Sequence, residues 1–417
     1  MKLENIGFYT LEDYRAMNVS SDSPMWRTEI IITEYCNFKC PYCRGLSSEI
    51  YGERQKKQLS LNEVKNIVDI WSDKGLKNIR FSGGEPTTHP DLIAMVEYAK
   101  DLGVSRIAIS TNGSASLELY QKLLDAGVND FSVSLDACCA DDIDKMAGVS
   151  GYYESIKNAI TFLSSKTYVT VGCVFTPDNV QKLIDTIAFA DSMGVSDVRI
   201  ISSAQWNAPI EKLADIPAEM LAKYPILKYR VENFLQGRNV RGIADTDCKK
   251  CYLMMDDSVV AGDYHFPCVI HMREKGQAIG RVGENMRSDR IAFMQKHDTH
   301  KDPICKKNCL DVCVDYNNRV ERFKIMTTDL DRLNTHAFAF GLWSAGCIHE
   351  FGIESRFASI VSESSKKILR QYAIGWSFAD DLPCRPKKNH IAVMFLVDDR
   401  RFWFHLRNNE FIEVFCK

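Results

Sequence analysis

The strongest constraint on the fold is a repeated strand–helix pattern across residues 28–202. Six short segments rich in β-branched and aromatic residues predict strands at 28–33, 78–83, 106–111, 130–135, 168–175 and 197–202. Between them lie helix-length segments whose apolar residues recur on one face, as Val64, Ile67 and Trp71 do. Strands linked by helices run parallel, with right-handed crossovers. The pattern therefore predicts an α/β fold, either a doubly wound sheet or part of a barrel.

An alternation of apolar and polar residues within the strands distinguishes between these two folds. In the second strand Ile79 and Phe81 alternate with Arg80 and Ser82. A parallel strand that is buried on both faces has a continuous run of apolar residues. Because these strands alternate, one face of the sheet must be exposed to solvent or must bind a ligand. We therefore expect a partial, TIM-like (β/α)6 barrel with a polar lumen. An antiparallel sheet is excluded because each link contains a helix-length segment.

Three cysteines, Cys36, Cys40 and Cys43, lie in the loop after the first strand, and no fourth cysteine is near them. Zinc sites usually take four protein ligands, often in CxxC pairs, so a lone triplet is a poor zinc site. Three thiolates leave one iron of a [4Fe–4S] cluster without a protein ligand, and that iron can bind a substrate or cofactor. Three buried small side chains are the alternative, but the spacing and Pro41 favour a loop wrapped around a cluster.

A second motif, FSGGEPTTHPDL at 81–92, begins in the second strand. Gly83 and Gly84 allow the backbone to approach a ligand closely, and Glu85 supplies a carboxylate that can accept hydrogen bonds from an ammonium group. Alone, such a turn is weak evidence. It follows the second strand as the cysteine loop follows the first, however, and the carboxyl ends of barrel strands are where active sites lie.

Together these motifs resemble the radical S-adenosylmethionine (SAM) superfamily over about residues 28–203. The resemblance rests on CNFKCPYC, on SGGEP, on STNG at 110–113 and on SLD at 134–136. It implies that the cysteine triplet holds three irons of a [4Fe–4S] cluster while SAM chelates the fourth. The reduced cluster would cleave SAM to methionine and a 5′-deoxyadenosyl radical, which takes a hydrogen atom from a substrate. An electron donor such as flavodoxin or ferredoxin is also implied.

The resemblance further assigns a set of cofactor contacts. The expected SAM-binding residues are Gly83, Gly84, Glu85, Thr111, Asn112, Ser134 and Asp136. The glycine turn would meet the methionine amino group, and the other four would contact the carboxylate or the ribose. For those four, side chains bonded to their own neighbours are an equal alternative. The glycine motif of the family's fifth strand is present only as Gly172, which leaves adenine contacts open.

Six further cysteines form two groups in the C-terminal half of the chain. They are Cys248, Cys251, Cys268, Cys305, Cys309 and Cys313. A CxxC pair, a turn and a later cysteine resemble the auxiliary-cluster modules, called twitch and SPASM domains, that follow some radical SAM barrels. Complete SPASM modules carry two extra clusters and use more cysteines. We therefore expect one auxiliary [4Fe–4S] cluster here, and two clusters are the alternative. A zinc site that pins a hairpin is the alternative.

The expected organisation has four parts: an N-terminal extension (1–27), the partial barrel (28–205), the auxiliary-cluster module (206–324) and an α+β C-terminal region (325–417). In the last part, residues 357–372 predict a helix, and residues 390–415 predict two or three antiparallel strands with turns near 398–399 and 408–409. A stabilising cap is favoured over a binding module there. Cys138, Cys139 and His89 follow strand ends and are interpreted as turn residues.

Composition limits the choice of function. The chain has 417 residues and a net charge of −3, which does not support a general polyanion binder. It shows neither a signal segment nor a membrane-spanning apolar run, so a cytoplasmic location is expected, where fifteen cysteines favour metal binding over disulfides. We expect an oxidoreductase or isomerase acting on a small-molecule or nucleotide-type substrate. A peptide-modifying maturase is the second hypothesis, and a non-catalytic metal-binding protein is the third.

Overall fold

A computed structural model describes residues 15–16, 19–21, 23–44, 58–73, 75–322 and 324, and the backbone of three strands between residues 390 and 416. The chain divides into two compact units, Met1–Glu321 and Arg322–Lys417. Among the described residues, no helix combines the length and apolar composition needed to cross a membrane.

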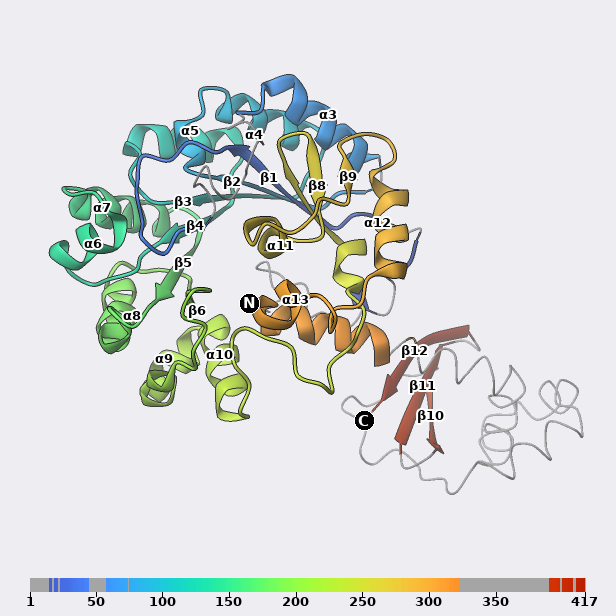
Figure 1. The fold of residues 1–417 in the computed structure, drawn as a ribbon. Coiled ribbons are helices and arrows are strands. Elements are labelled where there is room, and N and C mark those ends of the chain that lie inside the picture. The colour runs from blue at the N-terminus through green and yellow to red at the C-terminus, as the bar shows by residue number, and fades with distance from the viewer. Residues whose placement is uncertain are drawn as a thin grey trace, which may run out of the picture. The chain divides into compact units, whose positions relative to one another are not determined.

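The first unit is built around a curved sheet whose strands follow the order β6-β5-β4-β3-β2-β1-β7-β8-β9 (Figure 1). Strands β1 to β6 are parallel. Their bounds are β1 (Arg27–Thr33), β2 (Asn78–Gly83), β3 (Arg106–Thr111), β4 (Asp130–Ser134), β5 (Tyr168–Phe175) and β6 (Asp197–Ser202). Each lies within one residue of its expected position. The prediction of a partial (β/α)6 barrel is confirmed.

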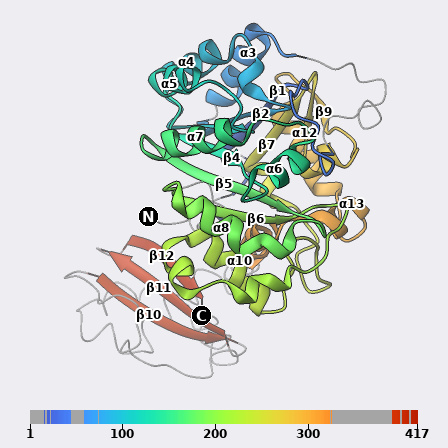
Figure 2. The ribbon, with the colours of Figure 1, turned by 90° about the vertical axis from the view of Figure 1, so that its left-hand side faces the viewer.

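Helices cover the outer face of this sheet (Figures 1 and 2). They are α3 (Leu61–Ser72), α4 (Leu92–Asp101), α5 (Leu117–Ala126), α6 (Ala140–Ala147), α7 (Tyr153–Ser164), α8 (Leu183–Ser192), α9 (Ala218–Lys223) and α10 (Pro225–Leu235). A capping box starts α3: the Ser60 hydroxyl accepts from the Glu63 amide at 3.3 Å, and the Glu63 carboxylate accepts from the Ser60 amide at 2.8 Å. Local sequence thus fixes where the helix begins.

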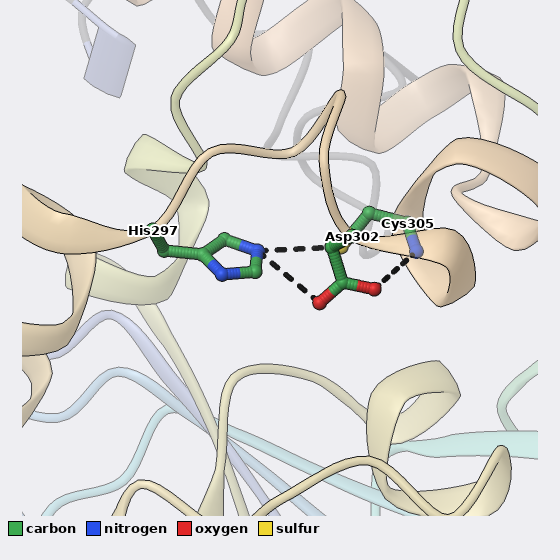
Figure 3. A group of neighbouring side chains, drawn as sticks. All are labelled: His297, Asp302 and Cys305. Carbon is green, nitrogen blue, oxygen red and sulfur yellow. Dashed lines mark hydrogen bonds and ion pairs between the residues drawn. The ribbon is translucent and has the colours of Figure 1, made fainter.

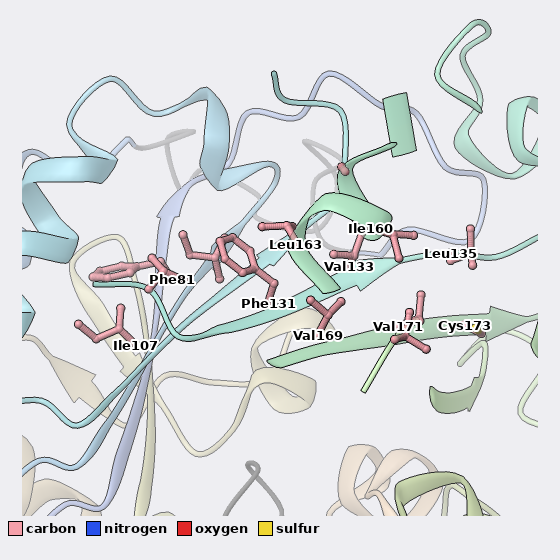
Figure 4. Close-up of a cluster of buried hydrophobic side chains, with 14 of the residues drawn as sticks. Phe81, Ile107, Phe131, Val133, Leu135, Ile160, Leu163, Val169, Val171 and Cys173 are labelled. Carbon is pink, nitrogen blue, oxygen red and sulfur yellow. The ribbon is translucent and has the colours of Figure 1, made fainter. Parts of the chain in front are cut away.

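The two faces of the sheet differ as the alternation of residues predicted. Phe81, Ile107 and Phe131 are buried between the strands and the outer helices (Figure 4). Their neighbours Arg80 and Ser132 instead point to the inner face and line a cavity. Burial of the apolar face holds the helices against the sheet, while the inner face stays polar.

A hairpin from the cysteine-rich segment extends the same sheet beyond β1. It consists of β7 (Asp257–Ala261) and β8 (Tyr264–Phe266), with Gly262 at φ 55° in the turn, followed by β9 (Gly280–Arg281). Strand β7 pairs in parallel with β1. The turn at Gly262 was expected, but the pairing with the barrel was not. The remaining helices here are α11 (Val269–Arg273), α12 (Met286–Lys296) and α13 (Pro303–Asn308), and residues 311–322 are also helical.

The second unit contains a three-stranded antiparallel sheet. Its strands are β10 (His390–Val397), β11 (Arg400–Arg407) and β12 (Glu410–Cys416), in that order across the sheet. These bounds confirm the expected strands on either side of residues 398–399 and 408–409. The helix expected at 357–372 lies outside the described residues.

Candidate active site

One cavity of about 450 Å³ lies against the inner face of the barrel sheet. All nine cysteines of the two expected sets line it: Cys36, Cys40, Cys43, Cys248, Cys251, Cys268, Cys305, Cys309 and Cys313. Polar lumen side chains such as Ser110 and Ser132 line the same cavity. The structure therefore brings together two cysteine sets that stand more than 200 residues apart in the sequence.

The first cysteine set lies on the loop that follows β1. The Phe38 amide donates to the Cys36 sulfur at 3.4 Å, and the Cys43 amide donates to the Cys40 carbonyl at 3.0 Å. The Asn112 side-chain amide, from the loop after β3, lies 4.0 Å from the Cys36 sulfur. Hydrogen bonds of this kind to sulfur tune a bound iron–sulfur cluster.

The chemistry of this donor set fits a cluster. Burial raises the pKa of Cys40 to about 12, with the charge of Asp136 as a second cause, and burial also raises the pKa of Cys36. Such thiols stay neutral at pH 7 unless a cation holds the thiolate. The three sulfurs do not all lie within 4.8 Å of one another, whereas a single Zn²⁺ holds its thiolates about 4 Å apart. A larger group with an open position fits this spacing better.

The glycine turn after β2 packs directly on the backbone of the cysteine loop. The Gly84 amide donates to the Thr33 carbonyl and the Glu85 amide to the Tyr35 carbonyl, both at 2.8 Å. A Cβ on Gly83 would lie 2.2 Å from the Thr33 oxygen, and a Cβ on Gly84 would lie 2.0 Å from the Tyr35 oxygen. Glycine is required at both positions because the two backbones touch. Both glycines line the cavity, as expected.

Glu85 joins the glycine turn to the end of β3. Its carboxylate is fully buried and accepts from the Thr87 hydroxyl at 2.6 Å, the Thr111 hydroxyl at 2.8 Å and the Asn112 amide at 2.7 Å. It is not among the residues that line the cavity. These bonds hold the turn in position, and the expected contact of Glu85 with the methionine amino group stays a prediction.

The four other expected SAM contacts, Thr111, Asn112, Ser134 and Asp136, all line the cavity. The Asn112 side chain donates to the Asn37 side chain at 2.8 Å and so links the third strand to the cysteine loop. Asp136 accepts from the Tyr42 hydroxyl, and from the Val174 amide at 2.7 Å. Burial raises the pKa of Asp136 to about 6. Ser134 is exposed on the cavity wall.

The second cysteine set surrounds the β7–β8 hairpin. Burial and the charges of neighbouring thiols raise the pKa values of Cys251, Cys268 and Cys305, and each of these three interacts with Cys313. The Cys309 thiol hydrogen-bonds to Cys313. These five sulfurs therefore form one electrostatically coupled group. For Cys248, burial raises the pKa to about 11. The largest charge interaction of this thiol is with Glu321, followed by Cys251.

A buried arginine from α12 holds this cysteine-rich hairpin in place. The Arg290 side chain has no exposed surface and donates to the carbonyls of Met254 at 2.6 Å and Phe266 at 2.8 Å. It also donates to the carbonyls of Asp257 and Pro267. These acceptors lie between Cys251 and Cys268, so one guanidinium fixes the segment that separates them.

Two side chains near Cys305 that have the chemistry and the position to bind a metal ion were missed by the sequence analysis. Figure 3 shows His297 and Asp302 beside Cys305, with the His297 Nε2 atom 3.6 Å from both the Cys305 sulfur and an Asp302 oxygen. His271 Nε2 lies 3.1 Å from the same carboxylate oxygen. In the described part of the chain, His297, Asp302 and Cys305 are the group whose ligand atoms lie within 4.8 Å of one another. Their placement within eight residues of Cys305 is the signal that could have found them.

Three residues interpreted as turn residues do lie in turns. His89 bonds to the Leu59 carbonyl at 2.8 Å and accepts from the Asp91 amide at 3.1 Å. Cys139 caps the start of α6 and donates to Asp142 at 2.8 Å. None of His89, Cys138 and Cys139 is among the residues that line the cavity.

Sequence comparison agrees with this site. Residues 30–190 match the family model of the Radical SAM superfamily. The chain is 30% identical to an AdoMet-dependent heme synthase of Methanosarcina barkeri over 39% of this chain and 46% of that protein. It is 27% identical to a probable GTP 3′,8-cyclase of Sulfurisphaera tokodaii over 41% of this chain and 54% of that protein. The chain thus spans about half the length of these relatives.

Comparison with solved structures gives lower sequence identities than comparison with the curated sequences. Streptococcus suis SuiB bound to precursor peptide SuiA superposes with a TM-score of 0.46 at 13% identity, over 71% of this chain and 69% of that chain. This degree of overlap carries no functional argument. The match to the family model spans the cysteine triplet, the glycine turn and strands β2 to β5. The chain therefore contains a radical SAM domain, the domain that binds a [4Fe–4S] cluster and SAM.

Proposed function

We propose that this protein is a radical SAM enzyme that reductively cleaves SAM and abstracts hydrogen from a small-molecule or nucleotide-type substrate. The observation that carries the proposal is the shared cavity. The cysteine triplet, the glycine turn and the polar lumen of the barrel all line it. A cluster and SAM bound there would supply a 5′-deoxyadenosyl radical next to the lumen.

The chain's own residues have separate tasks in this proposal. Cys36, Cys40 and Cys43 hold three irons and leave one position open for SAM. Gly83 and Gly84 let the turn after β2 lie against the cysteine loop, which brings their backbone to the cavity wall. The barrel wall positions the substrate and excludes water from the radical.

Two observations support a small molecule as the substrate. The cavity volume of about 450 Å³ lies within the range of sites for small ligands and cofactors. The similar proteins are named for GTP and for heme. A peptide is the second candidate, and no contact among the described residues favours it.

We propose further that the second cysteine set binds one auxiliary [4Fe–4S] cluster within a module spanning residues 206–324. Its six cysteines line the same cavity, so electrons could pass between a cluster here and the substrate. A zinc site would use His297, Asp302 and Cys305, whose ligand atoms lie within 4.8 Å of one another. Analysis of bound iron and sulfide distinguishes the two metals. Flavodoxin or ferredoxin would supply the electrons.

The test is anaerobic reconstitution with iron and sulfide, followed by reduction and measurement of 5′-deoxyadenosine. We expect Cys40→Ala to abolish 5′-deoxyadenosine formation while iron bound by the second set remains. Cys139→Ala is the matched control, because Cys139 does not line the cavity, and its activity should equal that of the wild type. Absence of 5′-deoxyadenosine from the reconstituted wild type would favour the non-catalytic alternative.

A further inference from the structure

Arginine dominates the charged part of the cavity wall. Seven arginines line the cavity, against three carboxylates: Arg27, Arg44, Arg80, Arg199, Arg230, Arg241 and Arg273, and Glu29, Asp136 and Asp257. The whole chain has a net charge of −3. The concentration of arginine is therefore a local property of this wall.

Four of these arginines have a carboxylate partner. The ion pairs are Arg27 with Glu29 and Asp257, Arg44 with Glu274, Arg80 with Asp130, and Arg230 with Asp311. Among the described residues, no carboxylate oxygen lies within 4.0 Å of Arg199, Arg241 or Arg273. These three arginines have no direct ion-pair partner there, and the charges of Glu29 and Asp130 reach Arg199 only over a longer distance.

Arg199 projects from β6 over a glycine of the neighbouring strand. Gly172 of β5 is its register partner, and a Cβ at Gly172 would lie 3.3 Å from the Arg199 Nη2 atom. Nη2 donates to the Ser132 hydroxyl at 3.0 Å, but the buried Nε atom has no hydrogen-bond partner. Burial lowers the pKa of Arg199 to about 10, so it remains a cation at pH 7. A buried cation with one neutral partner is costly unless a ligand completes its surroundings.

Arg241 follows α10 in the chain and also lines the cavity. Only 8% of it is exposed, and its donors reach the neutral carbonyls of Ser202 at 2.9 Å and Asn308 at 3.3 Å. Burial lowers its pKa to about 9, and repulsion from Arg44, Arg230 and Arg273 contributes. Among the described residues, Arg241 thus has arginine neighbours but no carboxylate of its own within 4.0 Å.

Three further carboxylates, Glu274, Asp130 and Asp311, pair with arginines of the wall, so seven arginines meet six carboxylates. The net charge around the cavity is therefore nearly balanced. An anion site is indicated by the arginines that have no ion-pair partner, and not by a net excess of positive charge. The larger charge interactions of Arg199 are with Arg80, Arg230, Glu29 and Asp130, and not with a cysteine.

We propose that Arg199, Arg241 and Arg273 bind the anionic groups of the substrate, which is a small molecule bearing phosphate or carboxylate groups. Guanidinium groups pair with both kinds of oxyanion through two parallel hydrogen bonds. This inference rests on the proposed function, because it names the class of substrate that the radical would attack.

The test uses the reconstituted holoenzyme with SAM under anaerobic conditions. Sodium tripolyphosphate and citrate serve as separate calorimetric probes, at low and at high NaCl concentration. We expect wild type to bind at least one probe, more weakly at high salt, and the preferred probe then identifies phosphate or carboxylate chemistry. Arg199→Gln should weaken binding about 10-fold or more, since a charge-assisted hydrogen bond is lost. Arg199→Lys should weaken it less, because the charge remains.

Arg281→Gln is the matched control, because Arg281 is exposed on β9 and does not line the cavity. Equal weakening by this variant, or no probe binding by wild type, would overturn the inference. Iron content and melting temperature are measured for every variant. If Arg241→Gln loses iron yet keeps its affinity for the probes, Arg241 serves the cluster instead of the substrate. If the probes bind through Arg199 but no 5′-deoxyadenosine forms, the anion site stands and the proposed function fails.

Discussion

Gly84→Ala tests whether the contact between the glycine turn and the cysteine loop is essential. An added Cβ would lie 2.0 Å from the Tyr35 oxygen and 3.0 Å from the Cys36 nitrogen. Real Cβ contacts are essentially never shorter than 3.0 Å, so the two backbones must separate by about 1 Å. That movement breaks the hydrogen bonds from Gly84 to Thr33 and from Glu85 to Tyr35.

The expected cost follows from these contacts. Two lost hydrogen bonds cost about 1 kcal/mol each, and forced overpacking adds about 1 to 3 kcal/mol, so the free energy of unfolding should fall by about 3 to 5 kcal/mol. Because a displacement of about 1 Å can cost 100-fold in rate, 5′-deoxyadenosine formation should fall by about that factor. The control is Gly283→Ala, where the added Cβ meets nothing within 4 Å. Wild-type activity and stability in Gly84→Ala would refute the reasoning.

Arg290→Met should destabilise the hairpin by about 3 to 5 kcal/mol, because four buried carbonyls lose a charged donor; iron analysis should show loss from the second cysteine set with SAM cleavage retained. His297→Ala should change the electron paramagnetic resonance spectrum of the proposed auxiliary cluster. His300→Ala, at a side chain that bonds to the Asp247 carbonyl at 3.0 Å, should leave it unchanged. Burial raises the pKa of Asp197 to about 6, against about 3.9 in an unfolded chain. The folded state then binds the proton of the Asp197 carboxyl more tightly than the unfolded chain does. The contribution of Asp197 to the free energy of unfolding is therefore full below about pH 4, and it falls by up to about 3 kcal/mol as the pH rises through about 6. Asp197→Asn should remove that change, as measured by urea unfolding at pH 4 and pH 7; an equal pH dependence in both proteins would contradict it.

The strands and the outer helices could be predicted because their signals are local. Side chains alternate across a strand, so Ile79 and Phe81 had to face the core if Arg80 and Ser82 faced the lumen. The Ser60–Glu63 capping box at the start of α3 is a local signal of the same kind, although the prediction of this helix rested on its apolar face. The cysteine spacing indicated which thiols belong together on one loop. All of these signals lie within a few residues of the feature that they predict.

Features that depend on contacts between distant segments were not predictable in the same way. Strand β7 has five residues and pairs with β1 across more than 200 positions. The pairing is supported by Arg27 with Asp257 at 2.6 Å and by Thr28 with Ser258 at 2.7 Å, which no local pattern reveals. The hydrogen bonds of Glu85 to Thr111 and Asn112 are of the same kind, since these partners come from the end of another strand.

The charge of the lumen is the feature that could least be predicted from the sequence. Alternation predicted that the inner face is polar, but Arg80 and Arg199 come from β2 and β6, and Arg241 and Arg273 come from beyond the sixth strand. The curvature of the sheet brings these cations to one cavity. Because they are wholly or partly buried and repel one another, the folded protein without ligand bears a cost that a bound anion removes. Substrate binding and stability are then linked, and an anion that occupies the site should stabilise the fold in proportion to the logarithm of its concentration above its dissociation constant.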